Sequence, residues 1–71
     1  MEANEKRYMN IREVSAYIGV SRWWVYKLVS ARRIPFIPLS RKVLKFDRER
    51  IDRWMKKKEV GTIQDFDVKE N

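Results

Sequence analysis

Two short segments with helical periodicity lie on either side of Gly19 and Val20, and this short break restricts the fold more than any other feature. Before it, three apolar residues recur on one face of a helix: Ile11, Val14 and Ile18. After Ser21, which is a good helix cap, a second apolar stripe follows: Val25, Leu28 and Val29. Two short helices joined by a tight turn are typical of a helix-turn-helix, and equally of a simple helical hairpin.

The ends of these helices carry recognisable signals. Asn10 is a good N-cap, and Glu13 stands where its side chain reaches back to the Asn10 N–H group, so a capping box opens a helix over residues 11–18. Gly19 supplies the left-handed residue that ends this helix. The second helix is predicted to continue to about Arg32.

A small β-hairpin is predicted next, because two prolines exclude further helix: Pro35 and Pro38. Residues 34–39 and 43–46 are interpreted as two short strands around the polar turn 40–42. Leu44 and Phe46 share one face by the two-residue period of a strand, with a basic residue between them on the other face. Such a hairpin is suited to act as a wing.

A third helix is predicted after Asp47, which can cap it. Its inward stripe is expected to consist of Ile51, Trp54 and Met55, with Trp54 in the core. The run 56–58 is all Lys and favours the negative end of the helix dipole, so we interpret it as a surface feature rather than a specific contact.

These elements predict a mainly α fold with a small β-hairpin, a winged helix-turn-helix of three helices plus a wing. We divide the 71 residues into an N-terminal extension, one domain and a C-terminal tail: 1–7, 8–59 and 60–71. The tail has apolar residues among acids without a clear period, and we expect it to be dispensable for folding. It either contacts a partner or folds back through Phe66 onto the domain.

The chain contains neither Cys nor His. Disulfides, thiolate metal sites and a histidine base are therefore excluded, and packing alone must hold the fold. Catalysis would need paired carboxylates or an activated lysine in a pocket, and a domain of this size has little volume for one. We expect no enzyme activity, no metal and no cofactor.

The net charge is +7, and it is unevenly placed. Residues 1–59 hold sixteen basic and seven acidic side chains, whereas residues 60–71 hold one and three. A basic body indicates a polyanionic partner. We expect no membrane span, since the longest uninterrupted apolar run is Trp23–Tyr26, and no signal peptide, since the charged residues 1–7 are followed by no apolar stretch. The expected location is the bacterial cytoplasm or nucleoid.

Residues 8–55 resemble the excisionase-type helix-turn-helix family, small winged-helix relatives of the MerR DNA-binding domain from phages and mobile elements. The resemblance is carried by an ordered set: Tyr8 and Met9, Ile11 to Glu13, Ile18 to Ser21, Val25, Tyr26 and Leu28, Ile34 and Pro35, and Ile51 with Trp54. It implies binding to double-stranded DNA, where an excisionase bends the duplex beside an integrase site. Close relatives are small transcriptional regulators.

The sequence departs from this family in the segment after the second helix. Arg32 stands where the family usually has Gly, so we expect a backbone position with positive φ. Ser40 or Arg41 replaces the glycine of the wing turn, and the wing is one residue longer.

The resemblance makes the outer face of the second helix the candidate DNA reader. Helical geometry puts Trp23 and Lys27 opposite the apolar stripe, with Trp24 on a flank where packing and DNA contact both remain open. The predicted DNA-binding residues are these: Ser21, Arg22, Trp23, Tyr26 and Lys27 on the helix, and Arg41, Lys42 and Lys45 on the hairpin.

Two further classes of function compete with DNA binding. A protein-interaction adaptor would present Trp23 and Trp24 to a protein, with the charge incidental. RNA binding is disfavoured because the hairpin is too small to stack several bases. If the excisionase resemblance extends to partners, the tail would contact an integrase or recombinase, or a second copy on DNA.

Overall fold

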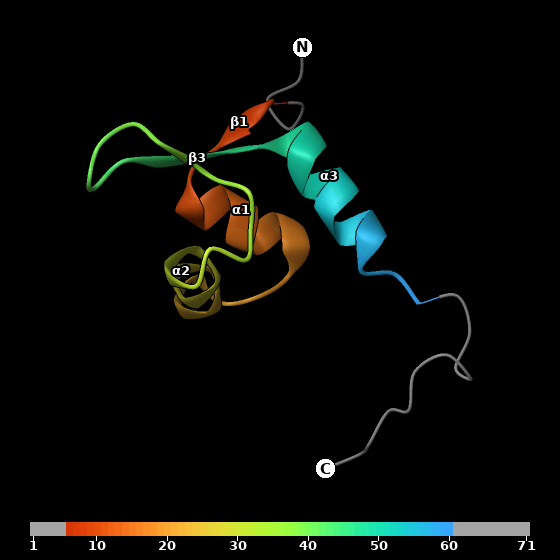
Figure 1. The fold of residues 1–71 in the computed structure, drawn as a ribbon. Coiled ribbons are helices and arrows are strands. Elements are labelled where there is room, and N and C mark those ends of the chain that lie inside the picture. Colours follow the sequence, from red (N-terminus) through yellow and green to blue (C-terminus); the bar gives the residue numbers. More distant parts are fainter. Residues whose placement is uncertain (1–5, 61–71) are drawn as a thin grey trace.

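The computed structural model describes residues 6–60, which form three helices and a small antiparallel sheet (Figure 1). In chain order the elements are β1 (Tyr8–Met9), α1 (Ile11–Ile18), α2 (Arg22–Ser30), β2 (Ile37–Pro38), β3 (Leu44–Asp47) and α3 (Arg48–Lys57). The predicted fold class of three helices with a small β structure is confirmed. The predicted behaviour of the tail falls almost entirely outside the described residues.

Helix α1 begins and ends as its sequence predicts. The side chain of Asn10 accepts a hydrogen bond from the Glu13 N–H at 2.8 Å, and the Glu13 carboxylate accepts one from the Asn10 N–H at 2.8 Å. Gly19 follows in the left-handed conformation with φ of 79°. Because this residue turns the chain sharply, α2 starts only three residues later, packed against α1.

Helix α2 ends at Ser30, two residues before the predicted Arg32, because the chain closes there in a Schellman motif. The Arg33 N–H donates to the Leu28 carbonyl at 2.8 Å, and the Arg32 N–H donates to the Val29 carbonyl at 2.9 Å. This motif needs a left-handed residue, and Arg32 has φ of 57°. A positive φ was expected at Arg32 because the family usually has Gly there, and the structure confirms it.

The sheet has three strands in the order β1-β3-β2, whereas the sequence predicted a two-stranded hairpin. Strand β1 was missed because two residues are too few to show an alternating pattern. The strand predicted over 34–39 is reduced to β2, and the one over 43–46 shifts by one residue to β3. Pro38 is tolerated in β2 because this strand lies at the sheet edge, where a missing N–H breaks no ladder.

Every helix and strand except the exposed β2 contributes one buried apolar side chain to the core, and the segment between α2 and β2 contributes another: Met9, Val14, Val25, Ile34, Phe46 and Ile51. Within the third helix the predicted stripe is only partly right. Ile51 is fully buried, Trp54 packs against the core but stays partly exposed, and Met55 is 43% exposed. Met55 lies at the edge of the helix face because so few elements surround α3.

Two polar contacts fix α3 against the helix-turn-helix. The Tyr17 hydroxyl donates to the Asp52 carboxylate at 2.6 Å, and this bond raises the pKa of Tyr17 above its usual value. The Trp54 indole N–H donates to the Arg33 carbonyl at 2.8 Å. Helix α3 is thus joined by side chains to α1 and to the segment that follows α2.

A bidentate ion pair joins the chain before β1 to the start of α3. Arg7 donates from Nε and Nη2 to the two carboxylate oxygens of Asp47, each at 3.2 Å. Asp47 also caps α3 by accepting from the Glu49 N–H at 3.0 Å. The hydrogen bond from Arg7 is the main cause that lowers the pKa of Asp47, against a smaller opposing effect of burial.

The left-handed residue at the end of α2 gives a first testable prediction. Arg32→Gly removes a side chain that disfavours positive φ and should stabilise the domain by about 1 kcal/mol. For a domain of this size that corresponds to a rise in Tm of roughly 4–8 °C in a thermal melt. Arg32→Ala is the matched control, because it removes the same charge but keeps a Cβ. Equal melts for the two variants would contradict the conformational explanation.

The Arg7–Asp47 pair gives a second prediction, on acid stability. Since the pKa of Asp47 is lower in the folded chain than in the unfolded one, its contribution is complete above the unfolded value, about 4, and is lost as pH falls through the folded value. Asp47→Asn keeps a capping side chain but cannot titrate, so its loss of Tm between about pH 5 and 2 should be smaller than that of the parent.

The residual acid dependence of this variant would come largely from Glu13, whose pKa is lowered mainly by the Asn10 N–H. Arg7→Gln is the second variant in this experiment. It removes the ion-pair partner of Asp47 and leaves Asp47 in place as the cap of α3. If Asp47→Asn melted with the same acid dependence as the parent chain, the ion pair would have no role in folding.

Candidate nucleic-acid interface

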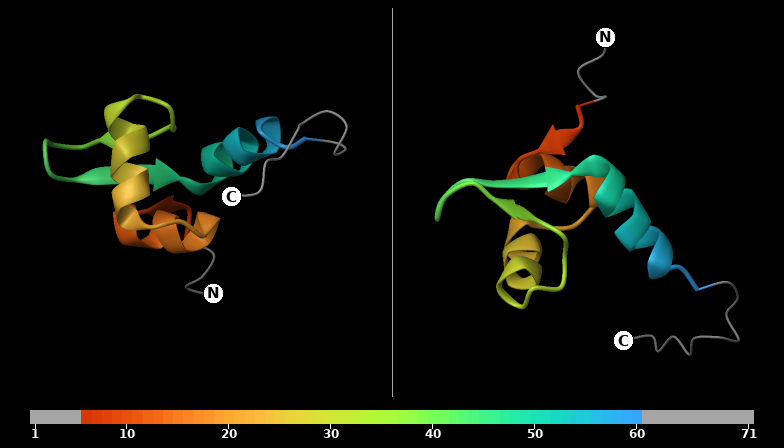
Figure 2. Two further views of the ribbon diagram at one scale, coloured as in Figure 1. Left: turned by 90° about the horizontal axis from the view of Figure 1, so that it is seen from below. Right: turned by 45° about the horizontal axis from the view of Figure 1, so that its top comes forward.

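The outer face of α2 is the most exposed part of the helix-turn-helix. Val25 on the inner side is fully buried, whereas Trp23 is 65% exposed and Lys27 lies beside it on the surface. Seen from below, α2 lies in front of the sheet, between the tip of the hairpin and α3 (Figure 2, left). The predicted orientation of α2 is confirmed by this burial pattern.

Two tryptophans and one lysine form an aromatic cluster on this face. The rings of Trp23 and Trp24 are 6.2 Å apart between centroids and tilted by 42°. The Lys27 ammonium lies 4.6 Å from the centroid of Trp23 and 5.4 Å from that of Trp24. Such contacts hold the charge at the helix surface and contribute roughly 0.5–1 kcal/mol at exposed sites. The cluster thus presents flat apolar rings and a positive charge together.

Trp24 belongs to this cluster, although the sequence left its role open. Its ring is 45% exposed, so it is no core residue. It also lines a shallow pocket toward α3 with Leu28 and Trp54. The spacing of three residues between Trp24 and Lys27 was the available signal, because residues i and i+3 are neighbours on a helix.

The N-terminus of α2 differs from those of the other two helices. The first turns of α1 and α3 contain Glu13 and Glu49, whereas the first turn of α2 contains no acidic residue. Ser21 caps α2 by accepting from the Trp24 N–H at 3.1 Å, and its own hydroxyl proton remains able to bond an acceptor. With Arg22 next in sequence, the positive end of this helix is not offset by a carboxylate in its first turn.

The hairpin of β2 and β3, here called the wing (residues 37–47), carries the other predicted basic residues (Figure 1). Its turn is closed by Ser40, whose hydroxyl accepts from the N–H groups of Lys42 and Val43 at 3.3 and 3.2 Å. Arg41 and Lys42 are exposed in this turn, and Lys45 is half-buried.

A groove of about 410 Å³ separates the wing from α2. Tyr26 lines it on the α2 side, and Arg41, Lys42 and Lys45 line it on the wing side. Four of the eight predicted residues are thus brought together here, while Ser21, Arg22, Trp23 and Lys27 form a neighbouring group on α2. Asn10 and Ile11 also line the groove, although the sequence indicated them only as a cap and a core residue.

A further group of basic residues was not among those predicted: Arg32, Arg33, Arg50, Arg53 and Lys57. The three on α3 follow the spacing i, i+3 and i+7, which places them on one face of the helix. That pattern was visible in the sequence. What was not visible is that the bend after α2 brings two further arginines opposite this face.

Neither metal binding nor membrane insertion is indicated by the geometry of residues 6–60. In this part of the chain no three acidic side chains gather closely enough to hold a metal ion, and the residue types His and Cys are missing from it altogether. No helix in the same range is long and apolar enough to cross a membrane. The described surface is instead rich in arginine and lysine.

Comparison with known protein families gives one match. A family model described as a helix-turn-helix domain matches residues 8–59, from the first residue of β1 to just beyond the end of α3. No curated protein and no solved structure matches the chain. The matched range contains all six helices and strands described above.

Proposed function

Because the chain belongs to the family of helix-turn-helix domains, we propose that it binds double-stranded DNA, with α2 in the major groove and the wing beside it. The observation that carries the proposal is the outer face of α2. The tight turn after α1 positions this helix. The exposed rings of Trp23 and Trp24 lie together with Lys27 on it, and the helix contains no acidic residue.

The proposed contacts follow from the chemistry of each side chain. Arg22 and Lys27 reach guanine edges or phosphates, and Ser21 with the first N–H groups of α2 binds a phosphate. Trp23 packs against a thymine methyl group or a sugar. Tyr26 and the wing residues Arg41, Lys42 and Lys45 lie along the adjacent backbone or minor groove, where a narrow groove concentrates negative potential.

A finer proposal concerns the role of the complex. The ordered resemblance to excisionase-type domains supports an architectural factor of a phage or mobile element that bends DNA beside a recombination site. Transcriptional regulation by the same domain is the alternative, and it requires binding but no bend. A recombinase, or a second copy on neighbouring DNA, is the proposed protein partner of the excision factor.

The third prediction concerns the salt dependence of DNA affinity. A target duplex is obtained by selection from a random-sequence pool, and affinity is measured by fluorescence anisotropy at several salt concentrations. About five displaced phosphate counterions give a log–log slope of roughly −4 to −6. Lys27→Ala and Arg22→Ala should reduce discrimination between target and random duplex, while Lys42→Ala should weaken both about equally.

Lys56→Ala is the matched control, because Lys56 pairs with Glu59 at 3.3 Å at the far end of α3. It removes the same charge away from α2 and the wing, so its affinity should stay close to that of the parent chain. A slope near zero would contradict the proposal and favour a protein-interaction adaptor. Equal losses for Lys27→Ala, Arg22→Ala and Lys42→Ala would contradict the assignment of α2 to the major groove.

The fourth prediction separates an architectural factor from a simple regulator. If the chain bends its target, complexes on duplexes of equal length should migrate differently in a gel when the site lies at the centre or at the end. The largest retardation is expected for the central site. Equal migration for all positions would remove the support for excision and leave the regulator.

A further inference from the structure

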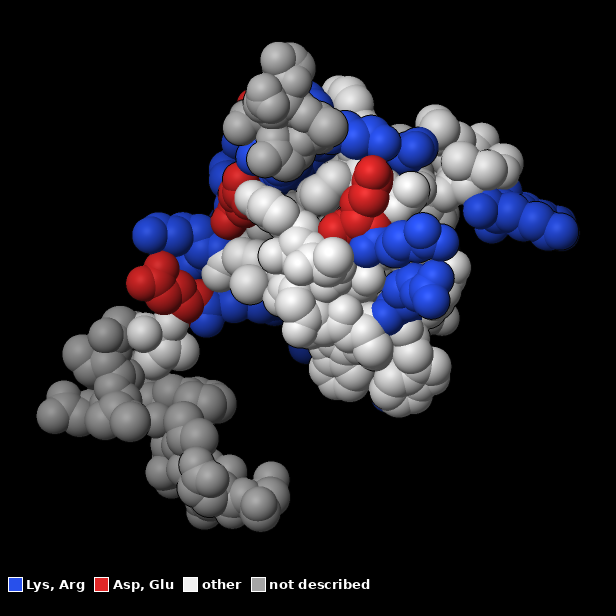
Figure 3. All heavy atoms as spheres, turned by 180° about the vertical axis from the view of Figure 1, so that it is seen from behind, with Lys and Arg blue, Asp and Glu red and all other residues white. Residues whose placement is uncertain are grey.

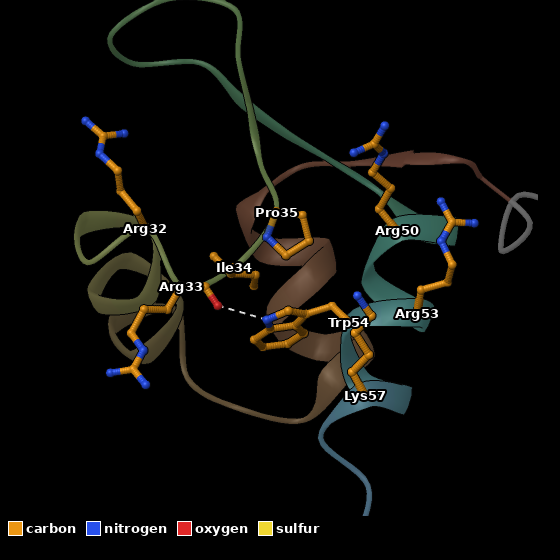
Figure 4. A pocket seen from close by; sticks show the side chains of 8 residues that line it. All are labelled: Arg32, Arg33, Ile34, Pro35, Arg50, Arg53, Trp54 and Lys57. Carbon is orange, nitrogen blue, oxygen red and sulfur yellow. Dashed lines mark hydrogen bonds between the residues drawn. The ribbon is translucent and has the colours of Figure 1, made fainter.

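The second basic group lies in a cleft between α3 and the segment that follows α2. This cleft, called here the rear basic cleft, has a volume of about 490 Å³. Arg32 and Arg33 stand on one side and Arg50, Arg53 and Lys57 on the other (Figure 4). Between them lies an apolar floor of Ile34, Pro35 and Trp54.

Few acids offset the charges of the rear basic cleft: the Asp47 carboxylate, which lies outside the lining, interacts electrostatically with Arg50. The lining contains five cations and no acidic side chain. None of the five forms an ion pair with an acid of residues 6–60. Figure 3 shows the face of the molecule opposite to that in Figure 1, and on this face acidic side chains lie among the basic ones. Because like charges around one opening repel each other, this arrangement is suited to a polyanion.

The rear basic cleft adjoins a pocket lined by Trp24 and Lys27 of α2, and Arg33 and Trp54 line both. The hydrogen bond from the Trp54 indole to the Arg33 carbonyl stands between the two surfaces. Trp24 and Lys27 line a pocket on one side of this contact, and neither of them lines the cleft on the other side. A group bound among the α3 cations of the cleft would lie beyond this contact from Trp24 and Lys27.

The backbone conformation after α2 places the two arginines on one side of the cleft. Arg32 has the only positive φ of any residue other than glycine among residues 6–60. A left-handed arginine is unfavourable where glycine would serve, and here it closes α2 in the Schellman motif. The left-handed position turns the chain so that Arg32 and Arg33 both stand on the side of the cleft opposite α3, with their side chains pointing in different directions (Figure 4).

We propose that the rear basic cleft binds phosphodiester groups of DNA outside the segment held by α2 and the wing, so that the domain has two DNA-binding faces. Guanidinium groups match phosphate in bidentate geometry, and four of the five cations are arginines. The apolar floor suits the faces of deoxyribose rings. The phosphates come either from the flank of the same duplex or from a second duplex. This inference rests on the proposed function, DNA binding by α2 and the wing.

The fifth prediction uses a double variant, Arg53→Gln with Lys57→Gln, at two exposed positions on α3. The matched control is Arg12→Gln with Lys56→Gln, which removes two charges outside the cleft. Anisotropy is measured with a selected duplex of about 12 base pairs, roughly 40 Å long, and with one of about 40 base pairs. Bridging is measured with two duplexes that carry different fluorophores.

The cleft variant should bind the short duplex like the control, because α2 and the wing are intact. If the cleft contacts the flank, the salt slope on the long duplex should become shallower by about 2 than that of the control. If it contacts a second duplex, energy transfer between the two fluorophores should be lost. Either result supports the proposal and identifies the source of the phosphates.

The proposal is overturned if the cleft variant and the control agree on the long duplex and in the bridging assay. It is overturned as well if the cleft variant loses affinity for the short duplex, since the two surfaces would then be one. Failure of the parent chain to bind any duplex would instead refute the proposed function. Thermal melts of both variants establish that the fold is retained in each.

Discussion

Six buried apolar side chains, from β1, the three helices, β3 and the segment after α2, hold this domain together, and every other feature depends on their packing. A chain of 71 residues without cysteine has no disulfide or thiolate metal site to replace them. Val14 and Val25 therefore have to face each other across the tight turn at Gly19, and this fixes how α2 is presented. Met9 adds β1 to the sheet for the same reason.

This small core also decides what remains on the surface. A helix of two to three turns buries only one side, so the tryptophan and lysine cluster of α2 stays outside. The wing extends from the same sheet whose Phe46 fills the core, and its basic turn lies across a groove from Tyr26. Interface and core are consequently two sides of the same short elements. Changes in packing at Val25 or Phe46 would displace both groups of basic residues.

The sequence predicted best where a signal is local. Caps at Asn10, Ser21 and Asp47 gave all three helix starts, and the missing glycine gave the positive φ of Arg32. Contacts between distant segments were not predictable in this way. Strand β1 and the rear basic cleft depend on how the chain folds back after α2. The spacing of residues within one helix or strand does not predict such a fold. The exposure of Trp23 and Lys27 followed from helical geometry, whereas their role in binding stays a prediction.

If the proposed function is right, α2 and the wing form the surface that holds DNA. This claim is tested most directly by titrating the ¹⁵N-labelled chain with its selected duplex and recording amide chemical shifts. We expect the largest changes in the first turn of α2 and in the wing turn around Arg41, with small changes at Met55 and Lys56 on α3. Changes that spare both α2 and the wing turn, or that fall chiefly on Met55 and Lys56, would contradict it.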